Sequence, residues 1–308
     1  MVILVSKEVI MLDFRLLTFL DLCHTKNYTK TAKNLNITQP AVSQHIRYLE
    51  QYYHRKLIVY QNRQFSLTKE GEYLLKEISH LHILSNAILQ NIQNISDADE
   101  LPVISIGSNP TIGEFILPGL ISAYSAQEPT CRIRSFIGTS KKLEQQLHDG
   151  IIDFLISDQI DFCPELERRL FCSEPICCVC NPGHPLAGKH VSLARLTSEK
   201  IVYRNRSSHA YQILKDSLQR LGYDLDTFNI PFEAGSMYSI IQYLKEDLAI
   251  SFLYRCAVKE YLNSGELAEI HVTEMHDSID FFCIFPQAVH TTPATEDFLQ
   301  FCLKQQKY

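Results

Sequence analysis

One stretch of the sequence, residues 27–51, constrains the fold more than any other. It reads NYTKTAKNLNITQPAVSQHIRYLEQ and joins a short Ala-containing segment, a two-residue turn and a longer amphipathic segment. In the longer segment Val42, Ile46 and Leu49 fall within about 60° of one another at 100° per residue, so they form one buried stripe. Thr38 is placed to cap this helix, and Pro40 falls in its first turn, where a missing N–H costs nothing. The pattern predicts two helices joined by a tight turn.

The opposite face of the longer helix is polar and lacks acids. Pro40, Ser43, Gln44 and Arg47 lie on it, and Gln39 stands at the exposed helix start. Amides read base edges in a major groove, arginine binds guanine or phosphate, and a helix N-terminus favours phosphate. A solvated face on any helical domain would look the same. This geometry therefore indicates DNA binding without establishing it.

The segments on either side complete a small basic domain. Asp13–Thr25 carries apolar residues at helical spacing, and Thr29–Leu35 reads as a short second helix that Tyr28 precedes. Between Asp13 and Glu72 there are nine lysines and arginines against five acids, a charge of +4. The charges of residues 1–12 sum to zero. Since the whole chain carries −6, residues 73–308 carry −10. A basic head on an acidic body is typical of a DNA-reading module fused to a separate domain.

Residues 14–75 resemble the winged helix-turn-helix of LysR-type transcriptional regulators. The resemblance rests on TKTAKNLNITQPAVSQHIRYLEQ and on LTKEGEYLL at residues 67–75, which closes the wing. The resemblance implies base contacts by Gln39, Pro40, Ser43 and Gln44, and phosphate contacts by Thr38, Arg47 and the wing residue Arg63. Two positions depart from the family pattern. The segment that usually reads Leu-Phe-x-Arg ends in Tyr60, and position 44, often basic, is Gln.

We expect one long helix from Tyr73 to about Ile95, roughly 35 Å at about 1.5 Å per residue. An ordinary core helix would show the same apolar repeat. The resemblance implies that the helix pairs antiparallel with its copy in a second subunit and places two recognition helices on a pseudo-palindromic site. The polar stretch SDADELP at 96–102 reads as a hinge. The predicted domains are therefore a winged helix-turn-helix (11–72), a linker helix (73–97) and an effector-binding domain (98–308).

Beyond Pro102 the pattern predicts strands alternating with helices, an α/β architecture of parallel sheets with crossover helices. We expect strands at 103–108, 133–138, 153–157, 200–204, 230–235, 248–253 and 279–286, and another beginning near Ile176. The expected helices are 111–124, 139–149, 207–221, one ending at Lys245, and 294–304. This half resembles the two-lobed periplasmic-binding-protein-like effector domain. Lobe I would comprise about 102–173 and 279–308, and lobe II about 174–278.

Three strand ends in this half are rich in small polar groups, and ligands of open α/β sheets bind at such ends. The candidate effector-binding residues are Ser108, Asn109, Thr111, Thr139, Ser140, Arg204, Arg206, Ser207 and Ser208. Their hydroxyls, helix N–H groups and guanidinium groups favour a small anion. Plain N-capping would also account for Ser108, Thr139 and Ser207. The two arginines could instead form an ion pair between the lobes.

The ten cysteines are scattered along the chain, which favours a reducing compartment and free thiols. The run ICCVC at 176–180 contains Cys177, Cys178 and Cys180. It lacks CxxC spacing and a nearby histidine, and it alternates like a buried strand, so we interpret these thiols as structural. A thiol-sensing regulator that uses this run, with Cys163 and Cys172, is the alternative.

No nucleophile elbow, P-loop, HExxH or dinucleotide motif occurs, so we expect no enzyme activity, catalytic residue, metal site or cofactor. His184 lies in a Pro-Gly turn, an ordinary loop of the family. An enzyme or a solute-binding protein with a DNA-binding head is a third alternative. No apolar run is long enough to span a membrane. The opening MVILVSKEVI is a poor signal peptide, and translation could begin at Met1 or Met11.

The sequence therefore predicts a cytoplasmic, LysR-type regulator of transcription. Its expected partners are double-stranded promoter DNA, a small effector, and further copies of itself in a homodimer or homotetramer. RNA polymerase is a further candidate partner. Effector identity, operator sequence and the choice between activation and repression stay open.

Overall fold

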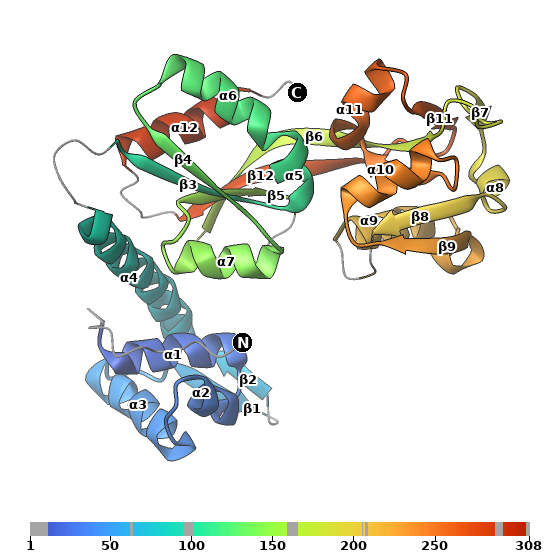
Figure 1. The fold of residues 1–308 in the computed structure, drawn as a ribbon. Coiled ribbons are helices and arrows are strands. Elements are labelled where there is room, and N and C mark those ends of the chain that lie inside the picture. The colour runs from blue at the N-terminus through green and yellow to red at the C-terminus, as the bar shows by residue number, and fades with distance from the viewer. Residues whose placement is uncertain are drawn as a thin grey trace.

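A basic helical head, one long helix and a two-lobed α/β body follow one another along the chain (Figure 1). The computed structural model describes residues 12–61, 64–94, 101–158, 166–204, 206, 209–286 and 292–305. The two candidate start residues, Met1 and Met11, lie outside these ranges, as does most of the expected hinge. Among the described residues, no helix has both the length and the apolar character needed to cross a bilayer.

The head is the predicted helix-turn-helix followed by a two-stranded wing. Its elements are α1 (Phe14–Thr25), α2 (Tyr28–Asn34), α3 (Gln39–Tyr52), β1 (Ile58–Gln61) and β2 (Gln64–Leu67). The Thr38 side chain accepts from the Ala41 N–H at 3.3 Å and so caps α3 as predicted. Val42, Ile46 and Leu49 are buried, which confirms the apolar stripe. The stripe packs against α1 in one core, so the opposite face of α3 is left to solvent.

The long helix α4 (Lys69–Asn94) begins at Lys69 rather than at Tyr73. Thr68 explains the earlier start, because its hydroxyl accepts from the Gly71 N–H at 3.0 Å and so caps the helix. The same hydroxyl donates to the Lys56 carbonyl at 2.6 Å. Gly71 lies so close to the wing that an added β-carbon would stand 2.1 Å from the Leu57 carbonyl oxygen. The head and α4 are thus joined without a flexible connection.

Lobe I is built on a sheet with helices on its faces (Figure 1). Its elements are β3 (Val103–Ser108), α5 (Pro110–Phe115), α6 (Leu117–Gln127), β4 (Arg132–Ile137), α7 (Ser140–His148), β5 (Phe154–Ser157), β12 (Ser278–Pro286) and α12 (Pro293–Lys304). Strand β3 pairs in parallel with both β4 and β5. The single helix expected at 111–124 is two helices, because Pro118 has no N–H to donate and its ring clashes with a carbonyl one turn back.

Strand β6 (Leu166–Cys180) runs through both lobes, whereas the sequence predicted a strand only from near Ile176. Its first part pairs antiparallel with β12 in lobe I. Its last part pairs antiparallel with β10 (Ser251–Tyr254) and β11 (Ala268–Val272) in lobe II. The sheet order is β4-β3-β5-β12-β6-β11-β7, with β10 also on β6. The sheet is therefore mixed rather than parallel, because the chain crosses between the lobes along β6 and returns along β12.

Lobe II surrounds the far half of β6. Its remaining elements are β7 (His190–Val191), α8 (Leu193–Leu196), β8 (Lys200–Arg204), α9 (His209–Arg220), a 3-10 turn (Leu225–Thr227), β9 (Asn229–Ala234), α10 (Met237–Lys245) and α11 (Arg255–Asn263). Strands β8 and β9 pair in parallel, as the predicted alternation requires. Asp247, which follows α10, adopts a left-handed backbone conformation with φ 53°.

The long helix also contacts lobe I at the C-terminal end of α7. The Asn86 side chain donates from Nδ2 to the His148 carbonyl at 3.3 Å. The ring of His148 lies 6.3 Å from that of His24 in α1, centroid to centroid. Burial lowers the pKa of His82 in α4 and raises the pKa of Asp149. Helix α7 therefore connects the body to both the linker helix and the head.

We expect Gly71→Ala to lower the free energy of unfolding by ~2 kcal/mol, because the new methyl group overlaps the Leu57 carbonyl. Chemical denaturation of the full chain measures the change. Gly235→Ala is the matched control, since nothing lies within 4 Å of an added β-carbon there. Equal stability of the two variants would show that the wing and α4 are not packed this closely.

Candidate DNA-binding surface and inter-lobe site

The solvent face of α3 carries the side chains predicted to contact DNA. The exposed residues are Thr38, Gln39, Pro40, Gln44 and Arg47, with Ser43 half-buried beside them. Gln39 donates from Nε2 to the Ser43 hydroxyl at 3.2 Å, so these two side chains are ordered by each other. Within the described part of the chain Arg47 forms no ion pair. Arg63 of the wing lies outside the described residues.

An open hollow of about 440 Å³ lies at the C-terminal end of α3. It is lined by Arg47, Glu50, Gln51, His54, Arg55 and Lys56. Glu50 accepts from the Leu57 N–H at 3.1 Å and pairs with Lys56 at 2.6 Å, which holds the start of the wing. The residues that line the hollow include three permanently charged cations, Arg47, Arg55 and Lys56, and one acid, Glu50. This excess of positive charge suits a phosphate backbone. Arg55 and Lys56 were not among the residues predicted to contact DNA. Two adjacent basic residues shortly after α3 are the signal that could have identified them.

A buried carboxylate joins the two lobes. Asp158 follows β5 in lobe I, and its side chain is 4% exposed. It accepts from Asn109 Nδ2 at 2.8 Å and from the Tyr254 hydroxyl at 3.1 Å. His209 Nδ1, at the start of α9 in lobe II, lies 3.1 Å from the same carboxylate. Of these four residues only Asn109 was predicted from the sequence as a site residue. Asp158, His209 and Tyr254 were missed, because only the fold brings them together.

The predicted effector residues of lobe I lie at neighbouring strand ends. Asn109, not Ser108, caps α5, accepting from the Ile112 N–H at 2.9 Å. Ser108 is fully buried, and its hydroxyl has no hydrogen-bond partner among the described residues. Thr111 is also buried, whereas Thr139 is exposed and precedes Ser140, the first residue of α7. Thr139 makes no capping hydrogen bond, so N-capping does not account for it.

The predicted lobe II residues lie at the end of β8. Arg204 Nε is buried without a hydrogen-bond partner in the described structure, and its charge acts on Tyr254. Arg206 is exposed and hydrogen-bonds the Tyr203 side chain. A cavity of about 30 Å³, lined in part by Arg204, Tyr211 and Tyr254, lies beside them. All of its lining residues belong to lobe II, so this cavity lies beside the inter-lobe cleft and does not measure the cleft itself. Ser207 and Ser208 lie outside the described residues.

The cysteine run at 177–180 lies in β6, and burial suppresses its acidity. Burial raises the pKa of Cys177 and Cys180 to about 12, and that of Cys178 well above its usual value. Cys172 is raised to about 12 for the same reason. Thiolate is the reactive form, so these thiols are poor sensors. Cys163 lies outside the described residues. No three metal-ligating side chains cluster in the described ranges.

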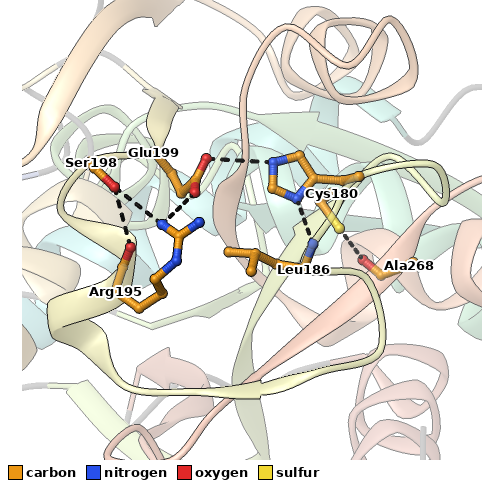
Figure 2. Close-up of polar contacts among 7 residues, drawn as sticks. Cys180, Leu186, Arg195, Ser198, Glu199 and Ala268 are labelled. Atoms are coloured by element: carbon orange, nitrogen blue, oxygen red, sulfur yellow. Dashed lines mark hydrogen bonds and ion pairs between the residues drawn. The ribbon is translucent and has the colours of Figure 1, made fainter.

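His184 and the end of β6 belong to a structural network at the far end of lobe II. Figure 2 shows Glu199 between the Arg195 guanidinium and an imidazole, and the Cys180 thiol directed at the Ala268 carbonyl. Arg195 lies 2.7 Å from Glu199, and His184 Nε2 lies 3.6 Å from it. His184 Nδ1 accepts from the Leu186 N–H at 3.2 Å. Both ring nitrogens of His184 therefore contact neighbouring residues, Leu186 and Glu199.

Two family models match the chain over the head and the body. Residues 15–72 match the bacterial regulatory helix-turn-helix protein of the lysR family, and residues 98–307 match the LysR substrate binding domain. The second match alone covers more than half of the chain. The HTH-type transcriptional regulator MJ0300 of Methanocaldococcus jannaschii is 24% identical over 295 residues, which are 93% of this chain and 97% of that protein.

Solved structures have the same fold. The LysR family transcriptional regulator CbnR matches with a TM-score of 0.58 and 17% identity, over 96% of this chain and 100% of that one. The CcmR regulatory domain of Synechocystis PCC6803, in complex with 2-PG, matches with a TM-score of 0.59 and 17% identity, over 67% of this chain and 98% of that one. The α/β fold class is thereby confirmed. The chain belongs to the LysR family, as a DNA-binding transcriptional regulator with an effector-binding domain.

Proposed function

We propose that the protein reads promoter DNA through α3 and responds to a small anion bound between its lobes. The observation that carries the first part is the exposed, acid-free face of Gln39, Gln44 and Arg47 over the buried stripe of α3. The amides would contact base edges, and Arg47 would contact phosphate. The basic hollow at Arg55 and Lys56 extends the phosphate-binding surface toward the wing.

An exposed apolar strip on α4 supports assembly into a homodimer or homotetramer. Leu81, Leu89 and Ile92 are exposed, with Ile92 61% exposed, and their spacing places them within about 80° on one side of the helix. A second copy of α4, packed antiparallel, would cover this strip. The two α3 helices would then face half-sites related by a two-fold axis, the arrangement that a pseudo-palindromic operator requires.

Helix α7 supports communication between the effector site and the head. Thr139 and Ser140, which we propose to contact the effector, stand at its N-terminal end, and its last residue, His148, accepts from Asn86 of the linker helix. An effector that shifts α7 would therefore move the surface on which α4 rests. The effect on DNA affinity is limited by the effector's differential affinity for the two arrangements, typically about 1–3 kcal/mol.

The remaining parts of the proposal follow from this role. The protein would act in the cytoplasm as a regulator and not as an enzyme, without a cofactor. RNA polymerase would be its partner at the promoter. The anion bound to the related CcmR domain, 2-PG, makes small phosphates and carboxylates the first effectors to test.

Fluorescence anisotropy on DNA from the protein's own upstream region tests the reading role of α3. We expect Arg47→Ala to reduce the slope of log affinity against log salt by about 1, because one phosphate contact is lost. Gln44→Ala should change the preferred site at a cost of ~1–3 kcal/mol on the original one. Arg132→Ala, which removes an equal charge from an exposed position of lobe I, is the control and should behave as wild type. Identical behaviour of all three variants would exclude α3 as the reading element.

Titration of the protein with 2-PG and with inorganic phosphate, followed by calorimetry, tests the effector site. Arg204→Gln should weaken binding of a responsive anion at least tenfold, because a charge-assisted hydrogen bond is lost. DNA binding without effector should be unchanged. Arg220→Gln, on the surface of lobe II, is the control. Equal affinities of the two variants for that anion would place the site elsewhere.

Alkylation separates this function from thiol sensing. With a pKa of about 12, only a fraction of ~10⁻⁴ of the Cys177 and Cys180 side chains is ionised to thiolate at pH 8. Iodoacetamide should therefore label these thiols in the native protein only as fast as the protein unfolds. Mass spectrometry after iodoacetamide treatment, with and without peroxide, measures the labelling. Rapid labelling that peroxide blocks would restore the redox alternative.

A further inference from the structure

The Asp158 carboxylate is surrounded by groups that commonly bind a ligand anion. Asn109 Nδ2 lies 2.8 Å from the carboxylate, and the Tyr254 hydroxyl and His209 Nδ1 each lie 3.1 Å from it. Burial raises the pKa of Asp158, but the donors His209, Asn109 and Tyr254 outweigh burial and leave the pKa below its usual value. Burial raises the pKa of Tyr254, which keeps its hydroxyl a donor.

These donors belong to different parts of the molecule. Asn109 comes from lobe I, His209 from lobe II, and Tyr254 from the end of β10, where it packs on Phe281 in the lobe I core. Figure 1 shows α5 and β5 in one lobe and α9 in the other, with β6 and β12 running between the two lobes. Asp158 therefore adds a polar contact between the lobes to the connection made by β6 and β12.

Asn109 and Tyr254 both donate to Asp158, so a second anion cannot take these hydrogen bonds while Asp158 occupies them. The cavity beside Arg204 measures about 30 Å³, too small for a carboxylate or phosphate. Arg204 Nε is nevertheless buried without a partner among the described residues, which leaves one cationic donor for a ligand. An anion that takes the hydrogen bonds of Asn109 and Tyr254 would have to displace Asp158.

We propose that Asp158 is a tethered substitute for the effector's anionic group, and that the effector acts by replacing it on Asn109, His209 and Tyr254. This inference rests on the proposed anionic effector and adds its mode of action. Asp158 closes the cleft in the free protein, and the effector closes it differently because its anion is not attached to β5. Asp158 thereby restricts effectors to compact carboxylates or phosphates that can enter its position and reach Arg204.

Chemical rescue tests the proposal without knowledge of the effector. Asp158→Ala removes only the carboxylate group, and formate has the same shape and charge. In the full-length protein we expect Asp158→Ala to melt at lower temperature than wild type. Formate, about 100-fold above its dissociation constant, should raise the melting temperature of this variant saturably by ~5 °C. Chloride at equal ionic strength should not.

Two controls assign the effect to this site. Asp216→Ala removes an exposed carboxylate from the same helix as His209 and should show no response to formate. Adding His209→Phe to Asp158→Ala should reduce the formate response, because the imidazole N–H donor is lost. If formate and chloride act alike on Asp158→Ala, the proposal is wrong. The readout involves no DNA, so a failure here is distinct from a failure of the proposed regulatory function.

Asp158→Asn provides a second measurement if the alanine variant does not fold, since it keeps the shape and loses the charge. Hydrogen exchange should then speed up in α9 and β10, which Asp158 contacts through His209 and Tyr254. Exchange in α3 of the head should stay unchanged. Unaltered exchange in α9 and β10 would overturn the tethered-anion proposal.

Discussion

The rest of the body depends on the antiparallel pairing of β6 with β12. Strand β6, fifteen residues long, pairs with β12 in one lobe and with β10 and β11 in the other, so both lobes are attached to one pair of continuous strands. Backbone hydrogen bonds along these strands resist shear between the lobes but permit bending across them. The cleft can therefore open and close while each lobe keeps its own core.

The lobes also touch beside these strands, through apolar and polar contacts: Ala210 and Ile213 of α9 pack on the lobe I core, and Phe115 of α5 packs on a lobe II core. Each lobe has its own apolar core, and Tyr254 is buried in the core of lobe I although it ends a strand of lobe II. The polar contacts between the lobes include those of Asp158, which lies 3.1 Å from the Tyr254 hydroxyl and 3.1 Å from His209 Nδ1. Such contacts can be exchanged for a ligand at little net cost, whereas an apolar core could not be opened in this way. Helix α7 then connects the cleft to the linker helix through His148 and Asn86.

Local signals predicted the head well, because caps and periodicity act within a few residues. Thr38, Pro40 and the stripe of Val42, Ile46 and Leu49 define α3 without help from the rest of the chain. The break at Pro118 and the full length of β6 were missed, since helical periodicity continues across the proline and β6 lacks one clear apolar pattern over its length. Asp158, His209 and Tyr254 were missed for a different reason. Their sequence separations of 45 to 96 residues leave no periodic trace, and only the pairing of distant strands brings them together.

The central claim is that one face of α3 selects the DNA sequence for a symmetric assembly. Selection of binding sites from a random duplex library, for wild type beside Gln44→Arg, tests it most directly. We predict that both proteins select an inverted repeat. In the variant, the base preferred at one position of each half-site should change to guanine, at the same position in both half-sites. An identical consensus for the two proteins, or a consensus without inverted symmetry, would contradict it.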